Sequence, residues 1–173
     1  MRETVWLIPL KDLDDDARAI KLGDVAVMEL AAGQEDFVGD PFAMMLMGLE
    51  DESRVPYVIE ADGAAVGVFT LQTGAATLAG WPDDDSAWLL RGFLIDQGHQ
   101  GRGLGSQAAA AAAREAHKLT ARLGSGQAGV VLSVNERNPA ARSAYEKAGF
   151  AESGRYLGGS TGPQLTMYRE FAG

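Results

Sequence analysis

The stretch Gln100-Gly101-Arg102-Gly103-Leu104-Gly105 contains three alternating glycines. An apolar run from Trp88 to Ile95 precedes it, and an alanine-rich segment from Ser106 to Leu123 follows. This order predicts a strand, a glycine loop and a helix. Backbone N–H groups in such a loop can turn toward an anion, and the dipole at the helix N-terminus adds to the attraction. The stretch therefore predicts a binding site for a phosphate-bearing ligand.

Composition limits the other classes of site. The 173 residues, of which 46% are apolar, predict a single globular domain over residues 1–173. Cysteine is absent, which excludes disulfides, thiolate zinc sites and a cysteine nucleophile. His99 and His117 are the only two histidines, so a His-rich metal site is excluded as well. We expect no metal.

The charge and the apolar pattern bear on partners and location. A formal net charge of −9 argues against nucleic acid, whose phosphates need Lys and Arg. It is compatible with a cationic substrate, or with solubility alone. The longest apolar runs are too short to span a bilayer, and the first residues lack the apolar core of a signal peptide. We expect a cytoplasmic protein without a membrane partner.

Periodicity and turn residues predict an α/β (α+β) fold, with a mixed central sheet of about six to seven strands and helices on both faces. Asp40 and Asn138 are expected to cap helices, and Asp62-Gly63 predicts a hairpin. Gly92 predicts a bulge within its strand. The strands are expected at 5–9, 57–60, 65–71, 87–95, 130–134, 151–156 and 165–171, and the helices within 11–32 and at 41–50, 106–123 and 139–147.

A dinucleotide site is one interpretation of the glycine loop. The residues from Gly103 to Ala108 satisfy the pattern G-x-G-x-x-(G/A). However, Asp96 to His99 separate the first glycine from its strand, and too few residues follow Val134 for the rest of such a fold. A nucleotide P-loop is excluded because no Lys-Ser or Lys-Thr follows the glycines.

A second motif favours another ligand. The segment 135–150 reads Asn-Glu-Arg-Asn-Pro-Ala-Ala-Arg-Ser-Ala-Tyr-Glu-Lys-Ala-Gly-Phe, and residues 100–105 fit Gln-x-x-Gly-x-Gly. In this order the two motifs resemble the hallmarks of the GNAT family of N-acetyltransferases, over roughly residues 57–171. The resemblance implies the GNAT fold, with the sheet splayed at a bulge near 92–95. It also implies an enzyme that transfers an acetyl group from acetyl-CoA to an amine and needs no metal.

Shorter stretches bear on the acceptor amine. Residues 34–38, 66–69 and 90–96 are similar to bacterial spermine/spermidine (diamine) N-acetyltransferases, which read Arg-Phe-(Met/Leu)-Ile-Asp before the glycine loop. Here Gly92 separates Arg91 from the phenylalanine, a departure from that pattern. The similarity implies a polyamine substrate. Aminoglycosides, amino acids and protein N-termini stay open as alternatives, as does a non-catalytic acyl-CoA-binding domain.

The family resemblance also implies where acetyl-CoA binds. Backbone groups of one strand segment would pair with the pantetheine arm like an added strand, one N–H polarising the thioester carbonyl. Backbone N–H groups of the loop would bind the pyrophosphate, its glycines permitting close approach and unusual φ values. The strand residues are Phe93, Leu94 and Ile95, and the loop residues are Gln100, Gly101, Arg102, Gly103, Leu104, Gly105 and Ser106.

The segment after residue 134 holds further candidates. Asn135 either bonds the pantetheine arm, as the resemblance implies, or forms a turn, and Asn138 is interpreted as a helix cap. Arg102 and Arg142 either neutralise phosphates or are surface charges. Tyr145 matches the family's general acid, since a phenol with a pKa of about 10 can protonate the departing thiolate.

No motif identifies the general base. Glu35, Asp36 and Asp83 to Asp85 are candidates for the base or for binding a cation, and we interpret each as an ordinary surface carboxylate. Homodimers are common in the family, so a homodimer is a possible assembly. The expected partner is a small-molecule amine.

Overall fold

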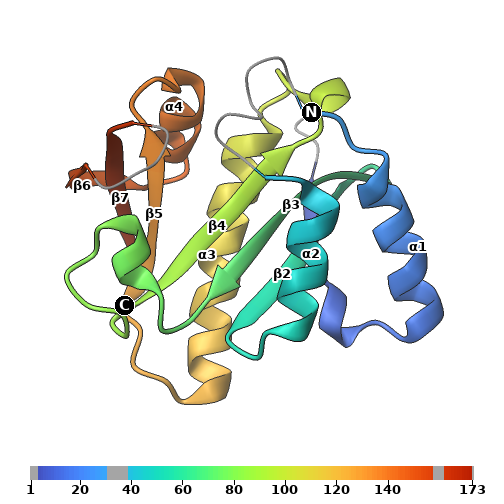
Figure 1. Cartoon of the computed structure of the whole chain (residues 1–173), viewed down its shortest axis with the longest axis horizontal. Coiled ribbons are helices and arrows are strands. Elements are labelled where there is room, and N and C mark those ends of the chain that lie inside the picture. Colours follow the sequence, from blue (N-terminus) through green and yellow to red (C-terminus); the bar gives the residue numbers. More distant parts are fainter. Residues whose placement is uncertain (1–3, 31–38, 158–161, 173) are drawn as a thin grey trace. The chain divides into compact units, whose positions relative to one another are not determined.

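The computed structural model describes residues 4–30, 39–157 and 162–172. They include a mixed sheet with the strand order β1-β2-β3-β4-β5-β7-β6 (Figure 1). The pair β4–β5 is parallel, and the pairs β1–β2, β5–β7 and β6–β7 are antiparallel. The strands are β1 (Val5–Pro9), β2 (Arg54–Ala61), β3 (Ala64–Gln72), β4 (Ala87–Ile95), β5 (Gly129–Asn135), β6 (Ala151–Tyr156) and β7 (Gln164–Glu170). The α-helices are α1 (Asp15–Ala26), α2 (Pro41–Glu50), α3 (Leu104–Leu123) and α4 (Pro139–Lys147).

The mixed α/β sheet expected from the sequence is confirmed, with seven strands in the described residues. The chain forms two compact units, one of residues 1–70 with 92–108 and one of residues 71–91 with 109–173. The single acetyltransferase domain over 1–173 stays a prediction.

Aspartates begin the two helices of the first unit. Asp14 Oδ1 accepts a hydrogen bond from Ala17 N at 2.8 Å, and Asp40 Oδ2 accepts one from Ala43 N at 3.1 Å. Each carboxylate satisfies an N–H group that has no acceptor within its helix, and its charge suits the helix dipole. Asp40 is the cap expected from the sequence.

The helical region expected within 11–32 is shorter than the pattern suggested. It begins with a single 3₁₀ turn, η1 (Leu10–Asp12), and α1 then runs only from Asp15 to Ala26. Asp12 therefore lies in η1 rather than in the first turn of α1. The guanidinium of Arg18 holds the two pieces together by donating to the carbonyls of Leu10 and Leu13 at 2.9 and 2.7 Å.

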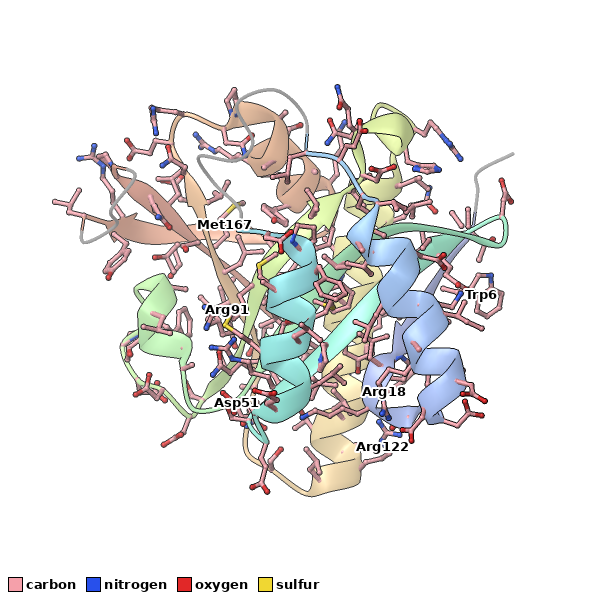
Figure 2. All side chains as sticks on the ribbon, turned by 45° about the vertical axis from the view of Figure 1, so that its right-hand side comes forward. Trp6, Arg18, Asp51, Arg91, Arg122 and Met167 are labelled. Carbon is pink, nitrogen blue, oxygen red and sulfur yellow. The ribbon has the colours of Figure 1, made fainter. Side chains whose placement is uncertain are left out.

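The helices α1 and α2 cover one face of the strands in the first unit (Figure 1). Val25 and Met45 reach from these helices into a fully buried cluster with Val58, Val68 and Leu94. Burying such side chains contributes about 1.5–3 kcal/mol each. The edge strand β1 instead presents Trp6 to solvent (Figure 2), with 65% of its surface exposed.

A two-residue turn joins β2 and β3. Asp62 and Gly63 have φ values of +52° and +77°, as the predicted hairpin requires. On these strands, Tyr57 stacks on Phe69 and Phe69 on Phe93, with ring centroids 4.9 and 6.2 Å apart. This aromatic series attaches the second half of β4 to β2 and β3.

In the second unit, α3 is attached to β4 by a buried polar pair. Trp88 Nε1 donates to Thr120 Oγ1 at 2.8 Å, and Thr120 Oγ1 donates to Ala116 O at 2.8 Å. The connection between β3 and β4 contains a short 3₁₀ helix, η3 (Ala76–Ala79), which the sequence did not predict. Thr166 Oγ1 on β7 donates to Ala79 O at 2.6 Å and fastens η3 to the sheet.

A substitution at Gly67 on β3 tests how closely β3 and β4 approach each other. A Cβ built at Gly67 would collide with the carbonyl oxygen of Leu94, a backbone atom that cannot rotate away. Gly67→Ala is expected to lower the free energy of unfolding by about 1–3 kcal/mol, measured by urea denaturation.

Gly23 in α1 provides the matched control. A Cβ there meets nothing within 4 Å, so Gly23→Ala is expected to stabilise the protein by up to about 1 kcal/mol. Equal unfolding midpoints for the two variants would contradict the close approach at Gly67.

Candidate functional site

The bulge predicted in β4 is present at Gly92. Its φ is +62°, in the left-handed region, and the paired ladder between β4 and β5 extends only from Ala87–Gly129 to Leu89–Val131. The strand therefore leaves its parallel partner shortly before the bulge. Gly92 is also the residue by which the chain departs from the Arg-Phe-(Met/Leu)-Ile-Asp pattern, so this departure is the bulge residue itself.

The three strand residues after the bulge differ in orientation. The carbonyl of Leu94 points at Gly67, and Asp96 N donates to Val66 O at 2.8 Å, so Leu94 and Asp96 direct their backbone groups toward β3. Successive residues of a strand direct these groups to opposite edges. Phe93 and Ile95 therefore direct theirs to the edge that faces away from β3.

The glycine loop is closed at its start by Gln100. The side-chain Nε2 of Gln100 donates to Ile95 O at 2.9 Å, across the short 3₁₀ turn η4 (Gln97–His99). Gly101 and Gly103 have φ values of +82° and +75°, which confirms the unusual backbone expected for them. Gln100 thus ties the loop to the end of β4.

The expectation for Gly105 was wrong in one respect. The helix α3 begins at Leu104 rather than at Ser106, so Gly105 lies inside its first turn and has no positive φ. The alanine-rich segment reaches back into the loop because residues 104–106 continue its helical geometry.

Asp96 connects the loop to the end of the α1 segment. Its Oδ1 accepts a hydrogen bond from Glu29 N at 2.7 Å, and its Oδ2 lies 3.0 Å from His99 Nδ1. Gln97 N donates to Glu29 O at 2.9 Å. These bonds hold η4 in place from two sides.

The start of α3 differs from the start of the other α-helices. Asp14, Asp40 and Asn138 each place a side-chain oxygen on the N–H groups of α1, α2 and α4. The residue before α3 is Gly103, which carries no side chain. Gln107 N donates to Gly103 O at 3.3 Å, which is the first hydrogen bond of the helix. The N–H groups of residues 104–106 precede this bond and have no acceptor within the helix. A ligand anion can take the place of the side-chain cap.

In the second unit, both predicted asparagines form local bonds. Asn135 is buried, and its Oδ1 accepts a hydrogen bond from Arg137 N at 2.8 Å. This bond agrees with the interpretation of Asn135 as a turn residue. Asn138 Oδ1 accepts from Ala141 N at 3.3 Å and caps α4, as expected. A contact between Asn135 and the pantetheine arm stays a prediction.

Tyr145 lies on α4 with only 9% of its surface exposed. Its ring meets Phe150 edge-on at a centroid distance of 6.0 Å. Burial raises the pKa of the Tyr145 phenol above its ordinary value, so the hydroxyl keeps its proton at neutral and mildly alkaline pH.

Arg142, on the same helix, is partly engaged by carboxylates. Its guanidinium lies 3.1 Å from Glu146 Oε1 and 2.9 Å from Glu152 Oε2. These exposed ion pairs are consistent with the surface-charge interpretation of Arg142.

The acidic candidates separate into two groups. Glu35 and Asp36, with the rest of the 34–38 motif, lie outside the described residues. Asp83 accepts from Ser86 N and Oγ at 2.7 and 2.6 Å, and Asp84 accepts from Thr77 N and Oγ1 at 3.0 and 2.6 Å. These hydrogen bonds lower the pKa of both carboxyls, so Asp83 and Asp84 organise their own loop.

Over residues 4–30, 39–157 and 162–172, no three His, Asp or Glu side chains gather closely enough to hold a metal ion. Within the same ranges, no helix has the length and apolar character that crossing a bilayer requires.

Sequence reasoning missed the neighbour of the bulge. A Cβ built at Gly92 would lie 2.9 Å from Met44 Sδ, so the α2 side chain rests on the bulge. Of the neighbouring methionines on α2, Met45 is fully buried, whereas Met47 has 51% of its surface exposed. Side-chain roles of Gln100 and Asp96 were also missed, because their bonds join residues whose proximity depends on the fold.

Comparison with known proteins identifies the class of enzyme. Residues 25–150 match the Acetyltransferase (GNAT) family, which is more than half of the chain. The chain belongs to this family. It is an acetyl-CoA-dependent N-acetyltransferase.

One curated relative is similar along most of its length. The chain is 28% identical over 151 residues to the uncharacterized N-acetyltransferase YbbJ of Bacillus subtilis, covering 85% of this chain and 89% of that protein.

Solved structures confirm the expected GNAT fold. A chimera of the spermidine N-acetyltransferase SpeG from Vibrio cholerae and hSSAT superposes with a TM-score of 0.65 at 16% identity, covering 96% of this chain and 95% of that one. The aminoglycoside acetyltransferase AAC(6')-Ib in complex with coenzyme A and kanamycin gives 0.66 at 19% identity, covering 97% and 94%. At these identities the likeness concerns the fold alone.

Proposed function

We propose that this enzyme transfers the acetyl group of acetyl-CoA to a primary amine of a small molecule, with Tyr145 as general acid. The start of α3 carries the proposal. It is a helix N-terminus that follows two left-handed glycines, Gly101 and Gly103, and Gly103, directly before the helix, has no side chain with which to cap it. Its N–H groups suit the two negative phosphates of the coenzyme A pyrophosphate.

The cofactor fits the first unit in two places. The residues Gln100, Gly101, Arg102, Gly103, Leu104, Gly105 and Ser106 would hold the pyrophosphate, chiefly through backbone N–H groups. The edge of β4 that faces away from β3 would receive the pantetheine arm at Phe93 and Ile95, because Leu94 directs its carbonyl toward Gly67. When bound, acetyl-CoA supplies an activated acetyl thioester and a thiolate leaving group.

Tyr145 would donate a proton to the departing thiolate of coenzyme A. The phenol carries its proton at neutral pH, and burial, which raises its pKa, keeps it protonated in the free enzyme. A protonated phenol beside the sulfur could donate its proton as the carbon–sulfur bond breaks, which is the role of a general acid.

The acceptor is an amine that must lose its ammonium proton, and a polyamine is our first candidate. The resemblance at 66–69 and 90–96 supports it, together with the acidic surface that a net charge of −9 creates. An aminoglycoside is the second candidate, because the fold is equally close to that of an aminoglycoside acetyltransferase.

A substrate panel tests the proposal directly. Purified enzyme with acetyl-CoA is offered spermidine, kanamycin, free amino acids and a peptide with a free N-terminus, and released thiol is measured. We expect turnover with spermidine and at least tenfold lower kcat/KM for the others. Turnover confined to kanamycin, amino acids or the peptide would overturn the polyamine assignment. Tight acetyl-CoA binding without turnover on any amine would indicate a non-catalytic domain.

Replacing the phenol hydroxyl separates catalysis from binding. Tyr145→Phe is expected to lower kcat by about 10²–10⁴-fold and to leave the KM for acetyl-CoA nearly unchanged, because the hydroxyl acts on the leaving group. Phe150→Leu, which alters the ring that Tyr145 contacts but keeps the hydroxyl, is the control for packing. Unaltered kcat in Tyr145→Phe would contradict the general-acid role.

Charge at the start of α3 provides a second test. Gly103→Asp would place a carboxylate on the N–H groups proposed for the pyrophosphate, and Gly103→Asn a neutral group of the same shape. Both side chains tolerate a left-handed φ better than other residues do. We expect KM for acetyl-CoA to rise at least tenfold more in the Asp variant than in the Asn variant, with the gap narrowing at high salt. Equal KM values in the two variants would place the phosphates elsewhere.

A further inference from the structure

The side chain of Met44 occupies the α2 side of the β4 bulge. Its Sδ and Cε lie 2.9 and 3.4 Å from the position of a Cβ at Gly92, and its Sδ lies 3.8 Å from that of a Cβ at Gly39. Glycine at both positions leaves room for the thioether. The thioether of Met44 therefore rests directly against the bulge.

A second methionine continues this surface. The inward stripe of α2 is formed by Phe42, Met45 and Leu49, which pack into the core of the first unit. Met44 lies beside that stripe, and Met47 lies one turn further along the same flank with 51% of its surface exposed. Their spacing of three residues makes Met44 and Met47 neighbours on the surface of α2, Met44 being the one at the bulge, and we name this apolar pair the Met44–Met47 strip.

The chemistry of the strip discriminates between amines. A thioether is apolar, polarizable and adaptable, and it offers only a weak acceptor to a hydroxyl group. Methylene groups that pack on the strip are removed from water, which lowers the free energy of binding. The hydroxyl groups of a sugar in the same place would lose hydrogen bonds to water without replacing them. The strip therefore favours an acceptor amine whose nitrogen is attached to an unbranched alkyl chain.

We propose that the Met44–Met47 strip is the specificity-determining surface for the acceptor, and that it selects aliphatic amines over polyhydroxylated ones. This inference rests on the proposed function, since it needs the acetyl group to be held at the bulge of β4. The amine then reaches the thioester carbon with its alkyl stem on Met44 and its further methylenes on Met47.

The test is a chain-length series of n-alkylamines from propylamine to heptylamine, with kanamycin as the polyhydroxylated amine. For the wild-type enzyme, kcat/KM should rise by up to about fourfold per methylene while the stem lies on the strip. Met44→Gln should flatten this rise and lower the ratio of alkylamine to kanamycin activity at least tenfold. Met47→Gln should lower kcat/KM only for the longer amines.

Two control variants separate selectivity from packing. Met44→Leu keeps the apolar volume and should retain the length dependence. Leu46→Gln alters an exposed apolar residue, 40% accessible, on the opposite flank of α2 and should behave as wild type. Calorimetric affinity for acetyl-CoA should be the same in all variants.

The outcomes distinguish this inference from the proposed function. Turnover without any length dependence in the wild type, or an unchanged ratio in Met44→Gln, would overturn the role of the strip and leave the acetyltransferase assignment intact. Acetyl-CoA binding without turnover of any amine in the series and the panel would overturn both.

Discussion

The left-handed backbone at Gly92 is the constraint on which the site depends. Any L-residue with a side chain would carry a conformational cost of about 1–2 kcal/mol at φ +62°, and its Cβ would also press on the thioether of Met44. β4 lies between β3 and β5 in the sheet, and its paired ladder with β5 ends before the bulge, at Leu89. Its first half pairs with β5, and its second half is held to β3 by the close approach at Gly67 and by the stacked ring of Phe93. The strand edge proposed to receive pantetheine lies beyond the residues of β4 that pair with β5.

The start of α3 differs from the start of the other α-helices by the residue at its cap position. Asp14, Asp40 and Asn138 each complete a helix with an oxygen of the protein. Gly103 has no side chain and cannot supply such an oxygen, whereas a side-chain cap contributes about 1 kcal/mol to a helix. The phosphate proposed to bind there would take the place of the cap and add its charge to the helix dipole.

Most of the fold could be predicted from the sequence because its signals are local. The Asp40 cap, the Asp62-Gly63 turn and the interruption of a β strand by Gly92 each depend on a few adjacent residues, and each was located correctly. The start of α3 was misjudged by two residues, because Leu104 and Gly105 look like loop residues until they join the helix. The contacts of Asp96 with Glu29, and of Met44 with Gly92, join residues far apart along the chain. Their proximity is a result of the tertiary fold, so no pattern in either segment could indicate it.

The division of the chain into two units has a consequence for how it folds. The boundaries at 70/71, 91/92 and 108/109 fall inside β3, β4 and α3, so neither unit is a continuous piece of chain. During synthesis the first unit lacks its last part until residue 108 has emerged, although its first 70 residues are made early. The second unit likewise begins with residues 71–91 and is finished only by β7. Neither unit can be expressed as a simple fragment, and cleavage in any surface loop would leave at least one of them in two pieces.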